Sequence, residues 1–550
     1  YLMIKTPLST VIGGAFWTLG ATVIGGAKLS SETVMKKLFS NNEQGFFYDP
    51  NDLSTMFQDA AGTVPVTAAG QPVGLMLDKS KGLVLGLETN TNASFNDWSG
   101  GKPVGYNLFK NDTTTFIEQS INGVRMRSTD GTNVQLTRGI AAGKYYEVVI
   151  NVDSLLSGSV ALESQGRRVK LIASSGVHTF RFYALSAWLD LKRGGGVTDF
   201  TIRSLSIKEL AGNHAYSPTS ASRPIFQQKP ILGNELVVNG DFSNGLTSWI
   251  YSDANVTNGV LNVVSTGTAW RSAYQNVNVT VGRTYLLSLK VLKSGTDNAF
   301  VTYGPLSNES SLKAYTAKAD TLQYKSYVFT ATEPTHRIRI QNGSSAVGFT
   351  VSADDISVRE ITGYLTDQNY LQFDGVDDFL QTNNINFTAT DKVSLFAGVR
   401  KLSDATTSAA LCEFSNNSTN INGTFSFFAP TSPNAQYQFR SKGTSASVYA
   451  SSPTNAYPAP HSTVLTGFGS PPQNIARLRV NGIQVANTPT GQGSSVYGNY
   501  PLYIGRRGGT SLPFNGHLYS LIGIGRLTTD SETVALEKSI AKNVGVTLNV

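Results

Sequence analysis

A weak internal repeat constrains the fold of this chain more than any other feature of its sequence. The segments from Leu83 to Leu210 and from Asn234 to Ile361 end in DFTIRSLSIKEL and GFTVSADDISVREI, in which apolar and polar residues alternate. A period of two predicts a half-buried β-strand. Earlier in each copy, RGIAAGKYYEVVINVDS matches VNVTVGRTYLLSLKVLKS, and GVHTFRFYALSAWLDLKRGG matches QYKSYVFTATEPTHRIRIQNG. Three strand pairs in the same order predict two β-sandwiches of about 130 residues each.

The composition favours β-structure along the whole chain. Charged residues make up 15% of the 550 residues, whereas 53 glycines, 27 phenylalanines and 23 tyrosines are spread among Ser, Thr and Asn. Aromatic runs between turn formers favour sandwiches over helices, and the chain is too apolar for disorder. A chain of this length exceeds one core and predicts three or four units of about 150 residues. We therefore expect an all-β fold of multiple β-sandwich (jelly-roll) domains, with a short, partly helical N-terminal anchor.

Charge and reactive residues exclude several classes of function. The net charge of +7 is spread without a run of five or six Lys or Arg, so we expect no nucleic-acid partner. The single cysteine, Cys412, excludes an intrachain disulfide, and its apolar neighbours predict a buried, inert thiol. The five histidines are scattered and form no zinc or catalytic motif. We expect no enzymatic activity, although paired carboxylates for glycoside hydrolysis would have no fixed spacing in a sequence.

Residues 1–45 are predicted to attach the chain to another protein. No charged residue lies between Lys5 and Lys28, close to the length of a membrane helix, but five glycines and four threonines make this stretch only weakly hydrophobic. We expect an apolar anchor buried against a partner, with a membrane span of residues 7–27 as the less favoured alternative. A short helix capped by Ser31, with Leu38 and Phe39 on its apolar face, is predicted to follow.

The second copy resembles a known class of binding module. Its opening NELVVNGDFSNGLTSW, its middle AWRSAYQNVNVTVGRTYLLSLKV and its closing DDISVRE resemble carbohydrate-binding jelly rolls of the galactose-binding-like type. Such modules bind sugars on exposed aromatic faces. The resemblance implies carbohydrate binding by side chains among Trp270, Tyr274, Tyr251 and Tyr303. Trp249 occupies what resembles a core position of the family.

The same resemblance implies a structural calcium ion. In the family this ion joins the first strand to the last through carboxylate and carbonyl oxygens, the hard ligands that calcium prefers. Asp241, with Asp354 or Asp355, stands at those places. The alternative is that Asp241 caps a turn while the other two face solvent. The first copy has Arg203 and Ser204 at the corresponding places, so no ion is expected there.

The C-terminal region resembles the concanavalin A-like, or laminin G-like, lectin sandwich. The resemblance is carried by YLQFDGVDDFLQTNN from Tyr370, by YIGRRGG, and by FNGHLYSLIGIGRL. A helix should follow, because Thr529 and Glu532 form a capping box and apolar residues recur at helical spacing after them. The aspartates of FDGVDD, at 374, 377 and 378, resemble a turn of that family more than a set of metal ligands.

The stretch GNHAYSPTSASRPIFQQKP, at residues 212–230, reads at first as a linker. In phage tail proteins with this lectin-like end, the sandwich is commonly preceded by segments resembling Phe47–Ser80, then GNHA and RP. Here those segments occur in order but are separated by the two repeats. We therefore predict a discontinuous lectin unit of residues 46–82, 211–232 and 362–550, with modules at 83–210 and 233–361 inserted into it. Consecutive independent domains are the alternative.

The resemblance implies a bacteriophage virion protein, such as a tail or head fibre or spike-like component. Its N-terminal segment would bind other virion proteins and its modules would bind host-surface glycan, with copy number supplying avidity. We expect a homo-oligomer in the virion. Two alternatives stay open: an architectural virion decoration or connector protein without glycan binding, and a polysaccharide-degrading enzyme with appended binding modules.

Overall fold

The structure, a computed structural model, describes residues 37–110, 113–295, 299–308, 322–404 and 407–549, and three short strands nearer the N-terminus. Those strands form a small antiparallel sheet: β1 (Thr10–Ile12), β2 (Ala15–Trp17) and β3 (Ile24–Gly25). The predicted helix start at Ser31 and most of the apolar anchor lie outside the described residues. Within them, no helix has the length and apolar character needed to cross a membrane. The chain is about 52% strand and 4% helix, which confirms the all-β sandwich class.

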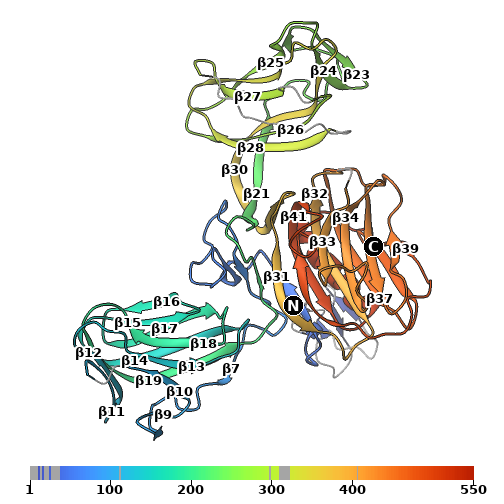
Figure 1. Cartoon of the computed structure of the whole chain (residues 1–550). Helices are drawn as coiled ribbons and strands as arrows, with labels where there is room; N and C mark the ends of the chain where they lie inside the picture. Colours follow the sequence, from blue (N-terminus) through green and yellow to red (C-terminus); the bar gives the residue numbers. More distant parts are fainter. Residues whose placement is uncertain are drawn as a thin grey trace.

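The first module contains two packed sheets and a small hairpin (Figure 1). One sheet has the order β11-β12-β19-β14-β17, with β7 also pairing with β19, and the other has the order β10-β13-β18-β15-β16. The strands are β7 (Leu85–Glu88), β8 (Trp98–Ser99), β9 (Lys102–Pro103), β10 (Tyr106–Phe109), β11 (Thr115–Ser120), β12 (Gly123–Ser128), β13 (Gln135–Gly139), β14 (Tyr145–Ser157), β15 (Val160–Ser164), β16 (Arg167–Ile172), β17 (Gly176–Tyr183), β18 (Trp188–Arg193) and β19 (Thr198–Leu210).

The second module repeats this strand order, except that none of its described strands corresponds to β16. Its sheets run β23-β24-β30-β26-β28 and β22-β25-β29-β27, so each segment that matched in the sequence occupies the corresponding place in the other copy. The strands are β22 (Ile250–Tyr251), β23 (Ala254–Thr257), β24 (Val260–Val264), β25 (Arg271–Asn278), β26 (Thr284–Lys293), β27 (Ala299–Pro305), β28 (Gln323–Thr330), β29 (Thr335–Asn342) and β30 (Thr350–Asp374). Separate buried clusters of apolar side chains fill the two modules.

The third body, called here the lectin body, is also a sandwich of two sheets. One has the order β36-β35-β34-β33-β40-β31-β20-β6-β5, and the other runs from the end of β30 through β41-β32-β37-β38-β39. The strands and the short helix η1 are β4 (Gly45–Tyr48), η1 (Leu53–Thr55), β5 (Met56–Phe57), β6 (Leu75–Met76), β20 (Ala215–Tyr216), β21 (Ile225–Glu235), β31 (Leu380–Asn386), β32 (Val393–Lys401), β33 (Ala410–Phe414), β34 (Thr424–Thr431), β35 (Gln436–Lys442), β36 (Val448–Ser451), β37 (His461–Ser470), β38 (Ile475–Val480), β39 (Ile483–Asn487), β40 (Asn499–Ile504) and β41 (Asn515–Ile524).

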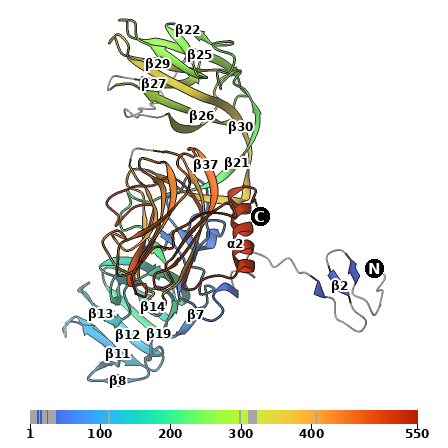
Figure 2. The same cartoon turned by 90° about the vertical axis from the view of Figure 1, so that its right-hand side faces the viewer.

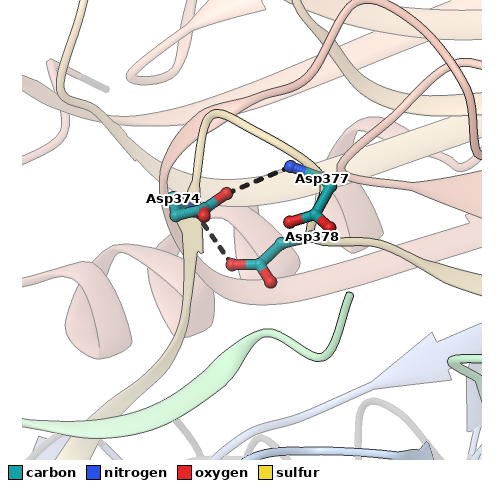
Figure 3. Close-up of side chains that lie close together, drawn as sticks. All are labelled: Asp374, Asp377 and Asp378. Atoms are coloured by element: carbon teal, nitrogen blue, oxygen red, sulfur yellow. Dashed lines mark hydrogen bonds between the residues drawn. The ribbon is translucent and has the colours of Figure 1, made fainter. Parts of the chain in front are cut away.

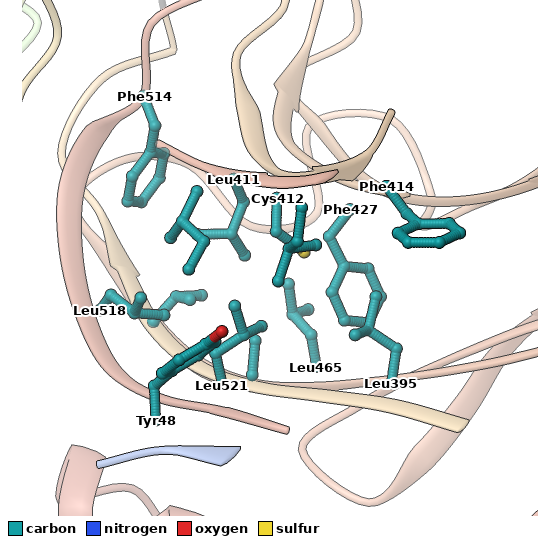
Figure 4. Close-up of a cluster of buried hydrophobic side chains, with 14 of the residues drawn as sticks. Tyr48, Leu395, Leu411, Cys412, Phe414, Phe427, Leu465, Phe514, Leu518 and Leu521 are labelled. Carbon is teal, nitrogen blue, oxygen red and sulfur yellow. The ribbon is translucent and has the colours of Figure 1, made fainter. Parts of the chain in front are cut away.

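Segments far apart in the sequence share the sheets of the lectin body. Strand β4 pairs with β41 in one sheet, so the region near residue 48 meets the region near residue 521. In the other sheet β20 lies between β6 and β31, so the regions near residues 76, 216 and 381 meet. Their apolar side chains enter one continuous core, in which Tyr48 lies beside Leu518 and Leu521 (Figure 4). Cys412 is buried in the same core, as its neighbours predicted.

A buried carboxylate ties three of these segments together. Asp78 is fully buried, and its Oδ1 accepts hydrogen bonds from the backbone N–H groups of Phe47 and Ser80, each at 2.8 Å. Its Oδ2 accepts from the backbone N–H of Asn213 at 2.7 Å and from the Ser80 hydroxyl at 2.8 Å. His214 Nδ1 accepts from the Asp78 backbone N–H at 3.0 Å, and burial lowers the pKa of this histidine, which keeps the ring neutral.

The GNHA stretch therefore has a physical role in this body. The Asn213 side chain donates to the Gly45 carbonyl at 2.7 Å, and the Tyr48 hydroxyl donates to the Asn213 carbonyl. A Cβ at Gly212, where φ is +154°, would lie 2.8 Å from the His214 ring, so a larger residue is disfavoured at that position.

The two modules are attached differently (Figures 1 and 2). The first module contacts the lectin body through a small core that includes Leu75, Tyr145 and Tyr183, and through an ion pair between Arg167 and Asp59 at 2.8 Å. The second module projects from the body on the antiparallel ribbon formed by β21 and β30, whose register shifts between Gln228 and Glu235. The first module is thus packed on the body, whereas the second is carried on a stalk.

The predicted C-terminal helix is present as α2 (Asp530–Val544), and it packs on the lectin body (Figure 2). Thr529 and Glu532 form the capping box, and Leu536, Ile540 and Val544 are buried. Glu532 also pairs with Arg526 at 2.7 Å, which lowers the pKa of Glu532 to about 2.

Candidate functional site

Trp270 has the features of an exposed aromatic platform. It directly precedes β25, its side chain is 60% exposed, and its ring stacks on that of Phe300 with centroids 5.8 Å apart and planes 19° apart. Its φ is +71°, a left-handed conformation that is unusual for a bulky side chain. The backbone N–H donates to the Asn342 carbonyl at 2.9 Å, which fixes this geometry. A strained backbone at an exposed tryptophan makes this surface a candidate for function.

The strand register continues this surface across the sheet β22-β25-β29-β27. Tyr274 lies opposite Arg339 on the neighbouring strand, and Phe300 is placed on the same outer face by the alternation of β27. The guanidinium of Arg337 lies over the Tyr274 ring at 4.4 Å, and that of Arg339 lies at 5.3 Å. Trp270, Phe300 and Tyr274 therefore lie on the outer side of this sheet, and the surface they make is called here the aromatic face of the second module.

Two residues predicted from the sequence do not belong to this face. Tyr303 is only 3% exposed, and its ring packs against Phe329 with centroids 3.9 Å apart; this corrects its prediction as a platform, because a sugar cannot reach it. Burial raises the pKa of its hydroxyl far above the ordinary value. Tyr251 is exposed but lies opposite the buried Ala273, so the register places it on the other side of the sheet from Tyr274.

Sequence reasoning missed Phe300, which supports the tryptophan. The signal was present in AFVTYGP, where period two places Ala299, Val301 and Tyr303 inward and Phe300 outward. Trp249 is buried, and its indole N–H donates to the Asn239 carbonyl at 3.1 Å, which confirms it as a core residue.

The predicted calcium ligands are close in space but do not form a converged set. The Ile356 backbone N–H donates to the Gly240 carbonyl, which brings Asp241 beside the end of the module. Asp241 Oδ1 accepts from the Ser243 backbone N–H and hydroxyl, as in the turn-capping alternative. Asp355 pairs with Lys290 at 2.7 Å.

The charges of these carboxylates would favour a bound cation, but calcium binding stays a prediction. The pKa of Asp354 is raised by burial and by the negative charges of Asp355 and Asp241, a repulsion that a cation would relieve. However, these three residues are absent from the groups of described carboxylates whose oxygens approach closely enough to share an ion. A calcium ion here would require the side chains to draw together.

Asp374, Asp377 and Asp378 do lie within ligand distance of one another (Figure 3). Asp374 Oδ1 accepts from the backbone N–H groups of Val376 and Asp377 at 2.7 and 3.3 Å, and the Asp374 N–H donates to Asp378 Oδ2 at 3.0 Å. Burial, assisted by the charge of Asp374, raises the pKa of Asp378 to about 7. These hydrogen bonds all lie within residues 374–378 and are those of a turn, as the sequence indicated.

A cavity of about 780 Å³ lies beside α2, between the segments near Phe47, Lys79 and Asp367. Its central charges are paired, because Lys79 contacts Asp52 at 2.8 Å and Asp49 at 3.3 Å. The cavity therefore lies along the seam between the separated segments, and this triad has a formal net charge of −1.

Comparison with known proteins bears on the lectin body. Residues 374–522 match the concanavalin A-like lectin/glucanases superfamily. No curated protein matches the chain in sequence.

Solved structures with low similarity to this chain include two structures of carbohydrate-binding modules and one domain of an arabinanase. The CBM22-1–CBM22-2 tandem domain of Paenibacillus barcinonensis Xyn10C has 12% identity, covers 53% of this chain and all of its own, and has a TM-score of 0.19. Domain 4 of AbnA, a GH43 extracellular arabinanase from Geobacillus stearothermophilus, in complex with arabinotriose, has 15% identity, coverages of 31% and 76%, and a TM-score of 0.25. The Ruminococcus gnavus IT-sialidase CBM40 bound to α2,3-sialyllactose has 14% identity, covers 28% of this chain and 97% of its own, and has a TM-score of 0.23. At these TM-scores the similarity says nothing about a ligand.

Proposed function

We propose that the protein is a non-enzymatic glycan-binding adhesin of a bacteriophage virion, a tail or head fibre or spike-like component. The aromatic face of the second module would bind sugar units of the host surface. The lectin body would act as the scaffold that carries both modules. Binding would be weak at each site and strengthened by the number of copies in a virion.

The observation that carries the glycan proposal is the Trp270–Phe300 stack. A half-exposed indole whose orientation is fixed by a neighbouring ring and a constrained backbone offers a flat apolar surface at little entropic cost. Pyranose rings present C–H groups that pack on such surfaces. The match of residues 374–522 to a lectin and glucanase superfamily supports the same class of ligand.

The virion assignment is supported by the order of chain segments. The pieces that precede lectin-like ends in phage tail proteins contribute strands β4, β6 and β20 to the lectin body here. The N-terminal segment would bind other virion proteins, and assembly in the virion would make the chain a homo-oligomer. We propose no membrane or nucleic-acid partner.

A glycan array probed with the full-length chain tests the adhesin proposal. We expect binding to host-surface glycans, reduced at least tenfold, or about 1.4 kcal/mol, by Trp270→Ala. Tyr251→Ala is the matched control, because it removes an exposed aromatic ring of the same module from the opposite side of the sheet. The proposal fails if no glycan binds, or if the two variants lose binding equally. Release of reducing ends from host polysaccharide would instead show an enzyme.

A further inference from the structure

The outer face of the first module contains a depression, which lies on a different module from the aromatic face. It has a volume of about 430 Å³ and lies on the sheet β10-β13-β18-β15-β16. Small-ligand sites in proteins commonly occupy about 300–1,000 Å³. The depression is therefore large enough for a sugar unit.

Strand register places a row of polar side chains across this depression. Asn107 lies opposite Thr137, and Thr137 lies opposite Asp190, on three adjacent strands. Their sequence neighbours Leu136 and Leu191 are buried in the core of the module. Because successive residues of a strand point to opposite faces, the polar row faces outward.

Hydrogen bonds hold Thr137 and Asp190 of this row in place before any ligand arrives. Gln135 Nε2 donates to Thr137 Oγ1 at 2.9 Å, and Thr137 Oγ1 donates to Asp190 Oδ1 at 2.6 Å. In the part of the chain that the structure describes, Oδ2 of Asp190 makes no side-chain hydrogen bond. A fixed carboxylate oxygen between amides is an acceptor suited to sugar hydroxyl groups.

Trp188 closes one end of the depression. Its side chain is 49% exposed, and it lies opposite Gly139, where an added Cβ would be 3.6 Å from the indole ring. The other side is the turn of Gln165 and Gly166, which both have positive φ. The depression thus combines an aromatic surface with polar side chains.

We infer that this depression binds an uncharged sugar unit of a glycan. Asp190 is the one charged residue that lines it, so a carboxylate- or sulfate-bearing sugar would be repelled. The nearby Lys192 is held by Glu163 at 2.5 Å. The inference rests on the proposed glycan-binding function for its ligand class, but on a different module and different residues.

Titration of the full-length chain with methyl glycosides of glucose, galactose, mannose and N-acetylglucosamine tests this inference. Ligand-detected NMR reports binding, and methyl glucuronide serves as the anionic probe. We expect one or more neutral glycosides to bind, with affinity reduced at least tenfold by Trp188→Ala and at least threefold by Asp190→Asn. We expect methyl glucuronide not to bind this site in the wild type or in Trp188→Ala, and glucuronide binding that is lost with Trp188→Ala would overturn the selectivity for an uncharged sugar. A circular dichroism spectrum equal to that of the wild type checks the fold of each variant.

The variant Trp270→Ala separates this inference from the proposed function. Neutral-glycoside binding that survives Trp270→Ala and is lost with Trp188→Ala supports the first-module site, even if the array shows no role for the second module. The inference is overturned if no neutral glycoside binds, or if binding is unchanged in both Trp188→Ala and Asp190→Asn.

Discussion

Replacing Asp78 with alanine should destabilise the lectin body more than any ordinary surface mutation. The fully buried carboxylate accepts four hydrogen bonds, two of them from the backbone of Phe47 and Asn213, which lie in separate segments. A hydrogen bond to a charged group contributes about 1.5–3 kcal/mol, and an orphaned buried donor costs a similar amount. The two long-range bonds alone predict a loss of about 3–6 kcal/mol, against a typical total of about 5–15 kcal/mol.

Differential scanning calorimetry of the full-length chain measures this effect. At roughly 2–4 °C per kcal/mol for a domain of this size, a loss of about 3–6 kcal/mol should lower one transition by about 6–24 °C. The transition of the second module should stay in place, because that module has its own core. Asp367→Ala is the matched control: it breaks an exposed pair with Lys542 and should cost less than about 1 kcal/mol.

Equal melting of Asp78→Ala and Asp367→Ala would show that Asp78 does not hold the separated segments together. An equal fall of every transition would also contradict this role, since it would mean that Asp78 does not act within one body. Asp78→Asn should lie between the wild type and alanine, because the amide keeps one acceptor oxygen but turns an NH₂ group toward the donors.

Three further predictions concern titration, reactivity and metal binding. The pKa of Asp378 is raised to about 7, so the folded state holds a proton that the unfolded state releases near pH 4, and stability falls as pH rises from about 4 to 7. Asp378→Asn should therefore melt several degrees above the wild type at pH 8 and equal to it at pH 4; the same difference at both pH values would contradict this. Burial raises the pKa of Cys412 to about 12, so the native chain should not react with a thiol reagent that labels it fully in denaturant, and fast native labelling would show that the core opens. The predicted calcium ion should raise the melting temperature of the wild type but not of Asp241→Asn. Equal melting temperatures of the wild type with and without calcium would contradict a calcium site.

Local patterns in the sequence were sufficient for the strands and the last helix. Period two in YYEVVINV and its counterpart predicted β14 and β26, and the capping box at Thr529 predicted the start of α2. Both signals depend on neighbours in the chain, which a sequence displays directly. The place of GNHA depended on resemblance, because the contacts of Asn213 with Gly45 and Asp78 join residues more than a hundred positions apart.

The candidate sites were harder to predict, for two physical reasons. The prediction for Tyr303 was wrong because it rested on the residue type and ignored the alternation along the strand. Tyr303 follows the buried Val301 by two residues, so its side chain points to the same inward face. The row from Asn107 to Asp190 depends on the register between three strands, and register follows from tertiary pairing rather than from local pattern.

Glycan recognition by both modules is tested by the affinity of four full-length chains for the glycan that binds most tightly on the array. These are the wild type, Trp188→Ala, Trp270→Ala and the double variant, each measured by biolayer interferometry on a glycan-coated surface. Two modules that both bind glycan predict a loss in each single variant and a loss of more than a hundredfold in the double variant, because avidity disappears with the second site. A double variant that binds as tightly as the wild type would contradict glycan recognition by these faces.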